Sequence, residues 1–279
     1  MTFGKRLDAA LDERGSLCVG IDPHPALLDA WGLSDDADGL ARFADTCVEA
    51  FAGTVAVIKP QSGLFEPYGS RGIAVLERTI AACREAGALV VLDVKRGDIG
   101  TTMAGYARAY LDPSAPLAAD AITVSPYLGV GSLEPAFELA ERHEAGVFVL
   151  ALTSNPEGPQ VQHARTTDGR IVAQAVLDEL ARRNAGADPM GSLGAVIGAT
   201  IGDADAGAHI RIDGLNGPYL VPGIGAQGGT AEDVRRIFGA AVHNVVPSVS
   251  REVLRHGPDA AALHAAAVTQ ITEFGFLRN

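Results

Sequence analysis

The residues best suited to chemistry lie in the run Asp93-Val-Lys95-Arg-Gly-Asp98, which directly follows an apolar segment. Asp93 and Lys95 are two positions apart on an expected strand, so their side chains point to the same face. Asp22 and Lys59 follow two other apolar runs. Opposite unit charges about 4 Å apart attract by ~4 kcal/mol at an effective dielectric near 20, which can hold Asp93 ionised and Lys95 protonated. We expect this network to place negative charge beside a substrate anion and to deliver a proton to a developing carbanion.

Each of these residues also has a purely structural interpretation. Asp98 lies at the expected start of a helix, where an aspartate commonly acts as the N-terminal cap. Asp93 and Lys95 could form a structural ion pair at the end of a strand. Buried ion pairs are a weak source of stability because desolvation offsets their attraction. The presence of Lys59 and Asp22 at neighbouring strand ends therefore favours the functional interpretation.

A second candidate site is the glycine-rich segment 221–230, which reads Val-Pro-Gly-Ile-Gly-Ala-Gln-Gly-Gly-Thr. Its glycines, Gly225 and Gly228 among them, leave backbone N–H groups available to an anion at the start of a helix. Arg251 follows the next apolar run and could grip a phosphate through two parallel hydrogen bonds. The alternative for Arg251 is an arginine on the surface of a helix.

The elements that must position these residues follow a regular pattern. Eight short apolar runs alternate with segments of helical period, and the runs are apolar throughout rather than alternating, which is typical of parallel strands buried on both faces. We expect strands at Leu17–Ile21, Val55–Lys59, Leu89–Val94, Ala121–Val124, Val147–Leu152, Leu193–Ala199, Tyr219–Val221 and Asn244–Val246, and helices within 38–51, 70–86, 131–143, 170–184, 229–239 and 258–274.

This alternation predicts a (β/α)8 TIM barrel in a single domain, residues 1–279, rather than a doubly wound sheet. The active sites of such barrels lie at the carboxyl ends of the strands, and their phosphate sites commonly follow strands seven and eight. The charged run and the glycine-rich segment would then share one mouth. The long segment 154–169 is a candidate lid over that mouth.

Composition narrows the possible functions. The chain of 279 residues has 22 Lys and Arg against 34 Asp and Glu, a net charge of −12 that argues against nucleic-acid binding. Its apolar runs are shorter than the ~20 residues of a membrane-spanning helix. Three widely spaced cysteines, Cys18, Cys47 and Cys83, favour a reducing cytoplasm over disulfides or zinc. No cluster of His and Cys has the spacing of metal ligands, so we expect no metal.

The charged run resembles the D-x-K-x-x-D signature of the orotidine 5′-phosphate decarboxylase family. The likeness extends through Val19-Gly-Ile-Asp22, Val57-Ile-Lys59-Pro, Thr153-Ser-Asn-Pro and the glycine-rich segment, in the expected order. The TSNP motif and the long segment after it resemble the bacterial type 2 branch. The resemblance implies a homodimeric cytoplasmic enzyme that decarboxylates orotidine 5′-phosphate to UMP in de novo pyrimidine biosynthesis, without a metal or other cofactor.

The resemblance also implies roles for the charged residues. Asp22 and Lys59 would hold ribose hydroxyls, with Lys59 also in the charged network. Asp93 would lie beside the departing carboxylate, and Lys95 would protonate C6. Loss of CO2 leaves a vinyl-type carbanion without an adjacent carbonyl sink, and a fixed ammonium stabilises that charge more in the transition state than in the ground state.

The resemblance also implies Asp98 as a further catalytic residue, and binding roles for several others. Asp98 and Thr102 would reach across a dimer interface into the partner's active site. Ser154 would hydrogen-bond the pyrimidine, and Gln227 and Arg251 would bind the phosphate. This chain departs from the family in the residue before the last arginine: the family often has Gly or Ser-Ser there, whereas this sequence reads Pro-Ser-Val-Ser-Arg.

Three other functions fit part of the pattern. A magnesium-dependent sugar-phosphate decarboxylase or aldolase of the same barrel group would act through an enediolate. A non-catalytic phosphate-binding barrel would keep Gln227 and Arg251 but would have no need for Asp93 and Lys95 together. A Schiff-base aldolase could use a lysine at a strand end, although such a lysine is normally desolvated and free of flanking carboxylates.

Overall fold

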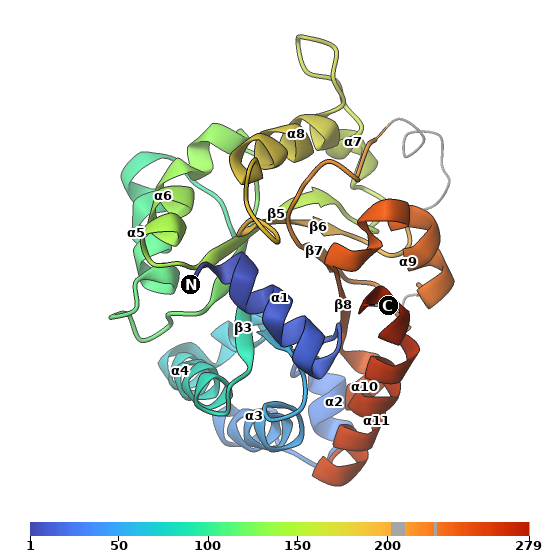
Figure 1. Cartoon of the computed structure of the whole chain (residues 1–279). Helices are drawn as coiled ribbons and strands as arrows, with labels where there is room; N and C mark the ends of the chain where they lie inside the picture. Colours follow the sequence, from blue (N-terminus) through green and yellow to red (C-terminus); the bar gives the residue numbers. More distant parts are fainter. Residues whose placement is uncertain (202–209, 226–227, 279) are drawn as a thin grey trace.

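The computed structural model describes residues 1–201, 210–225 and 228–278, and within them eight parallel strands close into a barrel (Figure 1). Each strand pairs with the next in chain order, and β1 also pairs with β8. The strands are β1 Cys18–Ile21, β2 Val57–Pro60, β3 Leu89–Arg96, β4 Ala121–Val124, β5 Gly146–Leu152, β6 Leu193–Ile197, β7 Tyr219–Val221 and β8 Val245–Val249. The prediction of a (β/α)8 barrel is confirmed.

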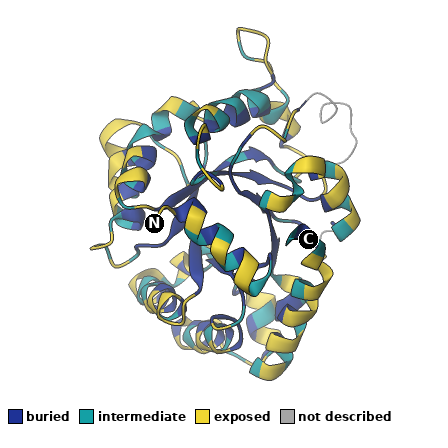
Figure 2. Ribbon diagram, in the orientation of Figure 1, coloured by how far each residue is buried: buried dark blue, intermediate teal, exposed yellow. Residues whose placement is uncertain are grey.

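Helices surround the barrel, with their buried faces toward the strands and their exposed faces outward (Figure 2). Those in the described residues are α1 Phe3–Arg14, α2 Pro25–Ala30, α3 Ala37–Phe51, α4 Gly69–Glu85, α5 Gly100–Leu111, α6 Glu134–Arg142, α7 Pro159–Gln162, α8 Val172–Asn184, α9 Ala231–Phe238, α10 Arg251–Leu254 and α11 Ala260–Glu273. Short 3-10 turns lie between them at Ser62–Leu64, Glu66–Tyr68, Val130–Leu133 and Gly239–Asn244, and another follows α11 at Gly275–Arg278. The helix expected over 131–143 is divided at Glu134, where the 3-10 turn ends.

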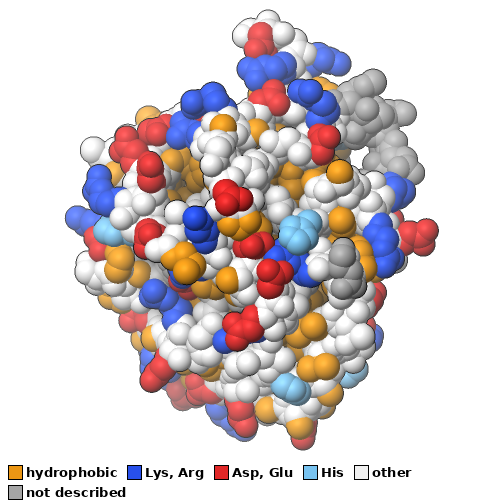
Figure 3. All heavy atoms as spheres, viewed as in Figure 1, with side chains coloured by type: hydrophobic (Ala, Val, Ile, Leu, Met, Phe, Trp, Pro, Cys, Tyr) orange, Lys and Arg blue, Asp and Glu red, His pale blue; other side chains and the backbone are white. Residues whose placement is uncertain are grey.

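The first helix, α1, closes the end of the barrel from which the strands start. In Figure 1 it lies across the barrel opening that faces the viewer, and its residues Phe3, Leu7 and Leu11 belong to the same buried cluster as the inward side chains of the strands. A Cβ atom on Gly146 would lie 2.3 Å from the Phe3 ring, so only glycine lets this ring approach β5. The surface on this side carries interspersed acidic and basic side chains (Figure 3). Any site in the barrel must therefore open at the opposite end.

Strand β3 is the longest of the eight and is irregular at the end where the charged residues lie. Its pairing with β4 shifts register between Leu92 and Arg96. Within this irregularity Lys95 has a φ of 44°, a left-handed conformation that is uncommon for a residue with a side chain. The bulge keeps Arg96 paired with Val124, so the strand runs two residues beyond the predicted end at Val94. It also presents Asp93 and Lys95 to one another.

In the described part of the chain, no helix has the length and apolar content needed to cross a bilayer.

Candidate active site

Four charged side chains meet at the carboxyl ends of β1, β2 and β3. Lys59 Nζ donates a hydrogen bond to Asp93 Oδ2 at 3.1 Å and lies 3.9 Å from Asp22 Oδ1. Lys95 Nζ donates to Asp93 Oδ1 at 2.5 Å. Lys59 and Asp93 are 6% and 7% exposed, whereas the Lys95 side chain is 45% exposed. The structure thus brings together Asp22, Lys59, Asp93 and Lys95, as the sequence predicted, with one ammonium open to the mouth.

The alternation of charge sets the ionisation of the two buried groups. Burial alone would raise the pKa of Asp93, but Lys59 and Lys95 outweigh it and hold that pKa well below its usual range. Burial alone would lower the pKa of Lys59, but Asp22 and Asp93 outweigh it and raise that pKa above its usual range. Each charge therefore keeps the other ionised. The Asp93 carboxylate and the Lys59 ammonium are fixed charges throughout the neutral pH range.

A buried hydroxyl that the sequence analysis missed joins this cluster. Thr123 on β4 is 1% exposed; its Oγ1 donates to Asp93 Oδ1 at 2.7 Å and accepts from the backbone N–H of Lys95 at 3.0 Å. The available signal was a polar residue inside the otherwise apolar strand Ala-Ile-Thr-Val. Threonine is a common strand residue, so this signal is weak.

Two buried oxygens at the mouth have no hydrogen-bond partner among the described residues, Asp22 Oδ1 and Gln61 Oε1. Gln61 follows β2 and forms a parallel bridge with Asp93, and the sequence analysis did not identify it. Buried acceptors without a donor are costly. This pair of acceptors suits a ligand that brings hydroxyl groups.

The segment expected to bind phosphate follows β7, as predicted. Gly225 and Gly228 have φ values of 68° and 90°, which favour glycine. The expectation that their N–H groups are free for an anion is wrong, because the N–H of Gly225 donates to the Gly229 carbonyl at 2.9 Å and that of Gly228 to the Gly225 carbonyl at 2.7 Å. Gln227 lies outside the described residues. Arg251 is the first residue of α10, directly after β8, and is exposed. Its guanidinium is available to a ligand, because no described residue pairs with it.

Asp98 and Thr102 do not join the charged cluster within one chain. Asp98 Oδ1 accepts from the N–H of Ile99 at 2.8 Å, and Thr102 lies exposed in the first turn of α5. The cap of α5 is Ile99, so Asp98 does not play the capping role that was its structural alternative. Three large apolar side chains are exposed in the same region, after β3 and β4: Ile99 at 62%, Tyr127 at 76% and Leu128 at 52%.

The segment 154–169 begins at the end of β5. Gln162 in α7 bonds back to this end, with its Oε1 accepting from the N–H of Thr153 at 2.9 Å and its Nε2 donating to Thr153 Oγ1 at 2.7 Å. Ser154 lies beside Gly198 at the end of β6. The chain between α7 and α8 then projects beyond the ring of helices (Figure 1), as a turn bridged by Arg165 and Ile171.

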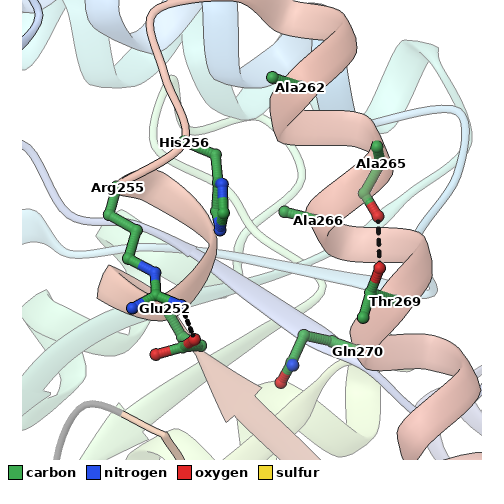
Figure 4. Close-up of a pocket in the computed structure, with 8 residues that line it drawn as sticks. All are labelled: Glu252, Arg255, His256, Ala262, Ala265, Ala266, Thr269 and Gln270. Carbon is green, nitrogen blue, oxygen red and sulfur yellow. Dashed lines mark hydrogen bonds and ion pairs between the residues drawn. The ribbon is translucent and has the colours of Figure 1, made fainter.

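Other parts of the molecule do not match this chemistry. A hollow between α10 and α11 is lined by Glu252, Arg255 and His256 on one side and by alanines, a threonine and a glutamine of α11 on the other (Figure 4). It contains none of the predicted site residues. All three cysteines are buried free thiols, and burial raises the pKa of Cys18 to about 12. Among the described residues, no three His, Cys, Asp or Glu side chains are grouped as metal ligands would be.

Comparison with known proteins adds an independent line of evidence. The model of the orotidine 5′-phosphate decarboxylase / HUMPS family matches residues 15–266. Proteins named orotidine 5′-phosphate decarboxylase from Salinispora arenicola and Streptomyces coelicolor are each 62% identical to this chain, covering 95% of it and 94% of the relative.

Solved structures give the same picture. A crystal structure of a Streptomyces avermitilis protein has a TM-score of 0.95 at 61% identity, covering 99% of this chain and 96% of that chain. The structure of Leishmania donovani OMP decarboxylase has a TM-score of 0.76 at 32% identity, covering 100% and 99%. The family match spans β1 to β8, and therefore every residue of the charged cluster.

Proposed function

This chain belongs to the orotidine 5′-phosphate decarboxylase / HUMPS family, and on that premise we propose that it decarboxylates orotidine 5′-phosphate to UMP, as a carboxy-lyase of pyrimidine biosynthesis. The observation that carries the proposal is the Asp93 carboxylate held between the ammonium groups of Lys59 and Lys95. The proposal assigns residues 1–279 to one barrel domain that acts in the cytoplasm.

The proposed reaction uses Lys95 as the proton donor. The bond between C6 and the carboxylate breaks, the electron pair stays on C6, and CO2 leaves. The Lys95 ammonium stabilises the developing negative charge and then transfers a proton to C6. Because its side chain is 45% exposed, Lys95 can recover a proton from solvent. Asp93, which stays ionised, holds the ammonium in place and lies beside the departing carboxylate.

The substrate would be held at both ends of the mouth. The Oδ1 of Asp22 accepts no hydrogen bond from the described residues, and with Lys59 and the amide oxygen of Gln61 it suits the ribose hydroxyls. Ser154 at the end of β5 would bind the pyrimidine.

The phosphate would lie beside Gly225 and Gly228, whose own N–H groups are used within the turn, with Gln227 and Arg251 as side-chain donors. Phosphate binding so far from the reacting carbon can still lower the barrier by orienting the ring and closing loops. We assign the segment 154–169 as one such lid, since its first residues start at the mouth.

The proposal includes a homodimer in which Asp98 and Thr102 complete the active site of the partner. The exposed apolar side chains Ile99, Tyr127 and Leu128 support it, because they follow the paired strands β3 and β4 and are well suited to burial at an interface.

The alternative functions fit less well. The Asp93 carboxylate accepts from two ammonium groups and a hydroxyl, with Oδ1 bonded to Lys95 and Thr123 and Oδ2 to Lys59. Its charge is therefore balanced by lysines rather than arranged for the magnesium ion of an enediolate mechanism. Lys95 is paired with a carboxylate, so it is a poor neutral amine for a Schiff base. A non-catalytic barrel would have no use for this cluster.

The test is an absorbance assay with orotidine 5′-phosphate, with and without EDTA. We expect the orotate absorbance to fall at the same rate in both conditions as UMP forms. No change with orotidine 5′-phosphate, together with magnesium-dependent turnover of a keto-sugar phosphate, would overturn the proposal in favour of the sugar-phosphate alternative.

A further inference from the structure

The hydroxyl of Thr123 connects the Asp93 carboxylate to the backbone from which Lys95 extends. A threonine hydroxyl has one hydrogen to donate and can accept others. Since Oγ1 accepts from the N–H of Lys95 at 3.0 Å, its own hydrogen goes to Asp93 Oδ1, 2.7 Å away. The two bonds therefore run in one direction, from amide to hydroxyl to carboxylate.

Packing does not account for this hydroxyl. Thr123 is 1% exposed, and its neighbours on β4, Ile122 and Val124, are fully buried. A valine would fill nearly the same volume without a polar group to desolvate. What the hydroxyl adds at this position is the pair of hydrogen bonds, and both of them end on residues of the proposed reaction.

Both hydrogen bonds of Thr123 lie at the irregular end of β3, where the sheet ladder does not fix the backbone. The register shift in β3 and the φ of 44° remove Lys95 from the regular ladder, so its N–H depends on Thr123 for a partner. Asp93 Oδ1 also accepts from Lys95 Nζ at 2.5 Å. Thr123 thus fixes the plane of the carboxylate and the backbone of the lysine that the same carboxylate holds.

We propose that Thr123 is a positioning residue for Lys95 and Asp93 in the decarboxylation, an inference that rests on the proposed function. Its hydroxyl is buried and both of its bonds are used within the protein, so it acts through these residues rather than on the substrate. Without it, the carboxylate can rotate and the bulge can relax, and Lys95 no longer lies where C6 would be.

The experiment compares Thr123→Val, Thr123→Ser and the control Thr79→Val. Thr79 is also a buried threonine, 3% exposed, but its hydroxyl donates to the Val75 carbonyl within α4. A misplacement of ~1 Å costs about 100-fold in rate, so we expect kcat of Thr123→Val to fall about 100-fold. We expect KM and the dissociation constant of UMP to stay within about threefold, since uniform binding is not lost. Thr123→Ser keeps the hydroxyl and should restore most of kcat, and Thr79→Val should leave kcat unchanged.

Amide hydrogen exchange at Lys95 provides a readout that does not depend on activity. We expect this amide to exchange at least about tenfold faster in Thr123→Val than in the unmodified protein, and to stay protected in Thr123→Ser. An unchanged kcat in Thr123→Val, or a Thr123→Ser variant as impaired as the valine variant, overturns the inference. If the unmodified protein does not decarboxylate orotidine 5′-phosphate, the proposed function is wrong. In that case an unchanged amide exchange rate at Lys95 in Thr123→Val shows that Thr123 does not position Lys95 either.

Discussion

Replacing Asp93 by Asn tests the electrostatic basis of the site most directly. The substitution keeps the shape of the side chain and removes its charge, which leaves Lys59 with Asp22 at 3.9 Å as its remaining acidic partner. Lys59 is only 6% exposed, and breaking a buried pair by removing one partner costs about 3–5 kcal/mol. Lys95 adds little to this cost, because its half-exposed ammonium regains water. We therefore expect Asp93→Asn to lower the free energy of unfolding by about 3–5 kcal/mol at pH 7.

The effect of this substitution should depend on pH in a defined direction. The folded-state pKa of Asp93 is depressed, so its contribution is fully present above the unfolded value of about 3.9 and is lost as the pH falls toward the folded value. The folded-state pKa of Lys59 is raised, so its contribution is present below about 10.4 and is lost as the pH rises toward the folded value. The difference between the two proteins should be constant between about pH 5 and 9 and shrink toward acid.

Urea unfolding at several pH values measures this difference. The matched control is Asp120→Asn, which removes a buried carboxylate, 5% exposed, that pairs with Arg6 at 2.6 Å near the α1 end of the barrel. It should destabilise the protein without lowering kcat. In the double variant Asp93→Asn/Lys59→Met the buried cation is gone as well, so its cost should be less than the sum of the two single costs. A stability of Asp93→Asn within about 1 kcal/mol of the unmodified protein, or strict additivity, would refute the reasoning.

Three further predictions concern catalysis and assembly. Lys95→Ala should lower kcat by more than about 10³-fold in the absorbance assay, since no other donor lies at C6; near-normal turnover would exclude Lys95 as the proton donor. Arg251→Ala should lower kcat/KM for orotidine 5′-phosphate by about 10²-fold or more without changing the unfolding midpoint. Arg255→Ala, directly after the same short helix and paired with Glu252, should match the unmodified enzyme. Ile99→Asp should shift the protein toward monomer in sedimentation velocity and make activity fall on dilution; a monomeric variant with full activity would argue against a shared active site.

Much of the fold could be predicted because parallel barrel strands are buried on both faces. The apolar runs therefore locate β1 to β8 to within a few residues. The ends are less predictable. Strand β8 runs to Val249 although its predicted end was Val246, because Pro247 still pairs with Val221 despite having no N–H to donate. The predicted end of β3 was too early because the charged residues Lys95 and Arg96 do not resemble a buried strand. No residue type in this segment indicates the bulge that keeps Arg96 in the sheet.

The site was predictable where it depends on strand periodicity and was not where it depends on local backbone geometry. Lys59 and Asp93 lie on adjacent strands whose ends must meet at one mouth, so their contact follows from the fold. The left-handed backbone of Lys95 could not be foreseen, because a lysine carries no signal for a positive φ as a glycine would. Thr123 acquires its role only through that backbone, since the amide it accepts from is displaced by the bulge.

The two lysines of the cluster should differ in what they contribute to stability, and this difference separates a structural from a chemical role. Lys59 is buried, with its ammonium between Asp22 and Asp93. Lys59→Ala leaves Asp22 without its cation and the buried Asp93 with the half-exposed Lys95 alone, so it should cost about 3–5 kcal/mol. The Lys95 side chain is 45% exposed and its ion pair is open to water, so Lys95→Ala should change the free energy of unfolding by no more than about 1 kcal/mol while abolishing turnover. Urea unfolding of both variants at pH 7 decides this. If Lys95→Ala destabilises the protein as much as Lys59→Ala does, then Lys95 serves mainly to neutralise Asp93, and its assignment as the donor to C6 loses its physical basis.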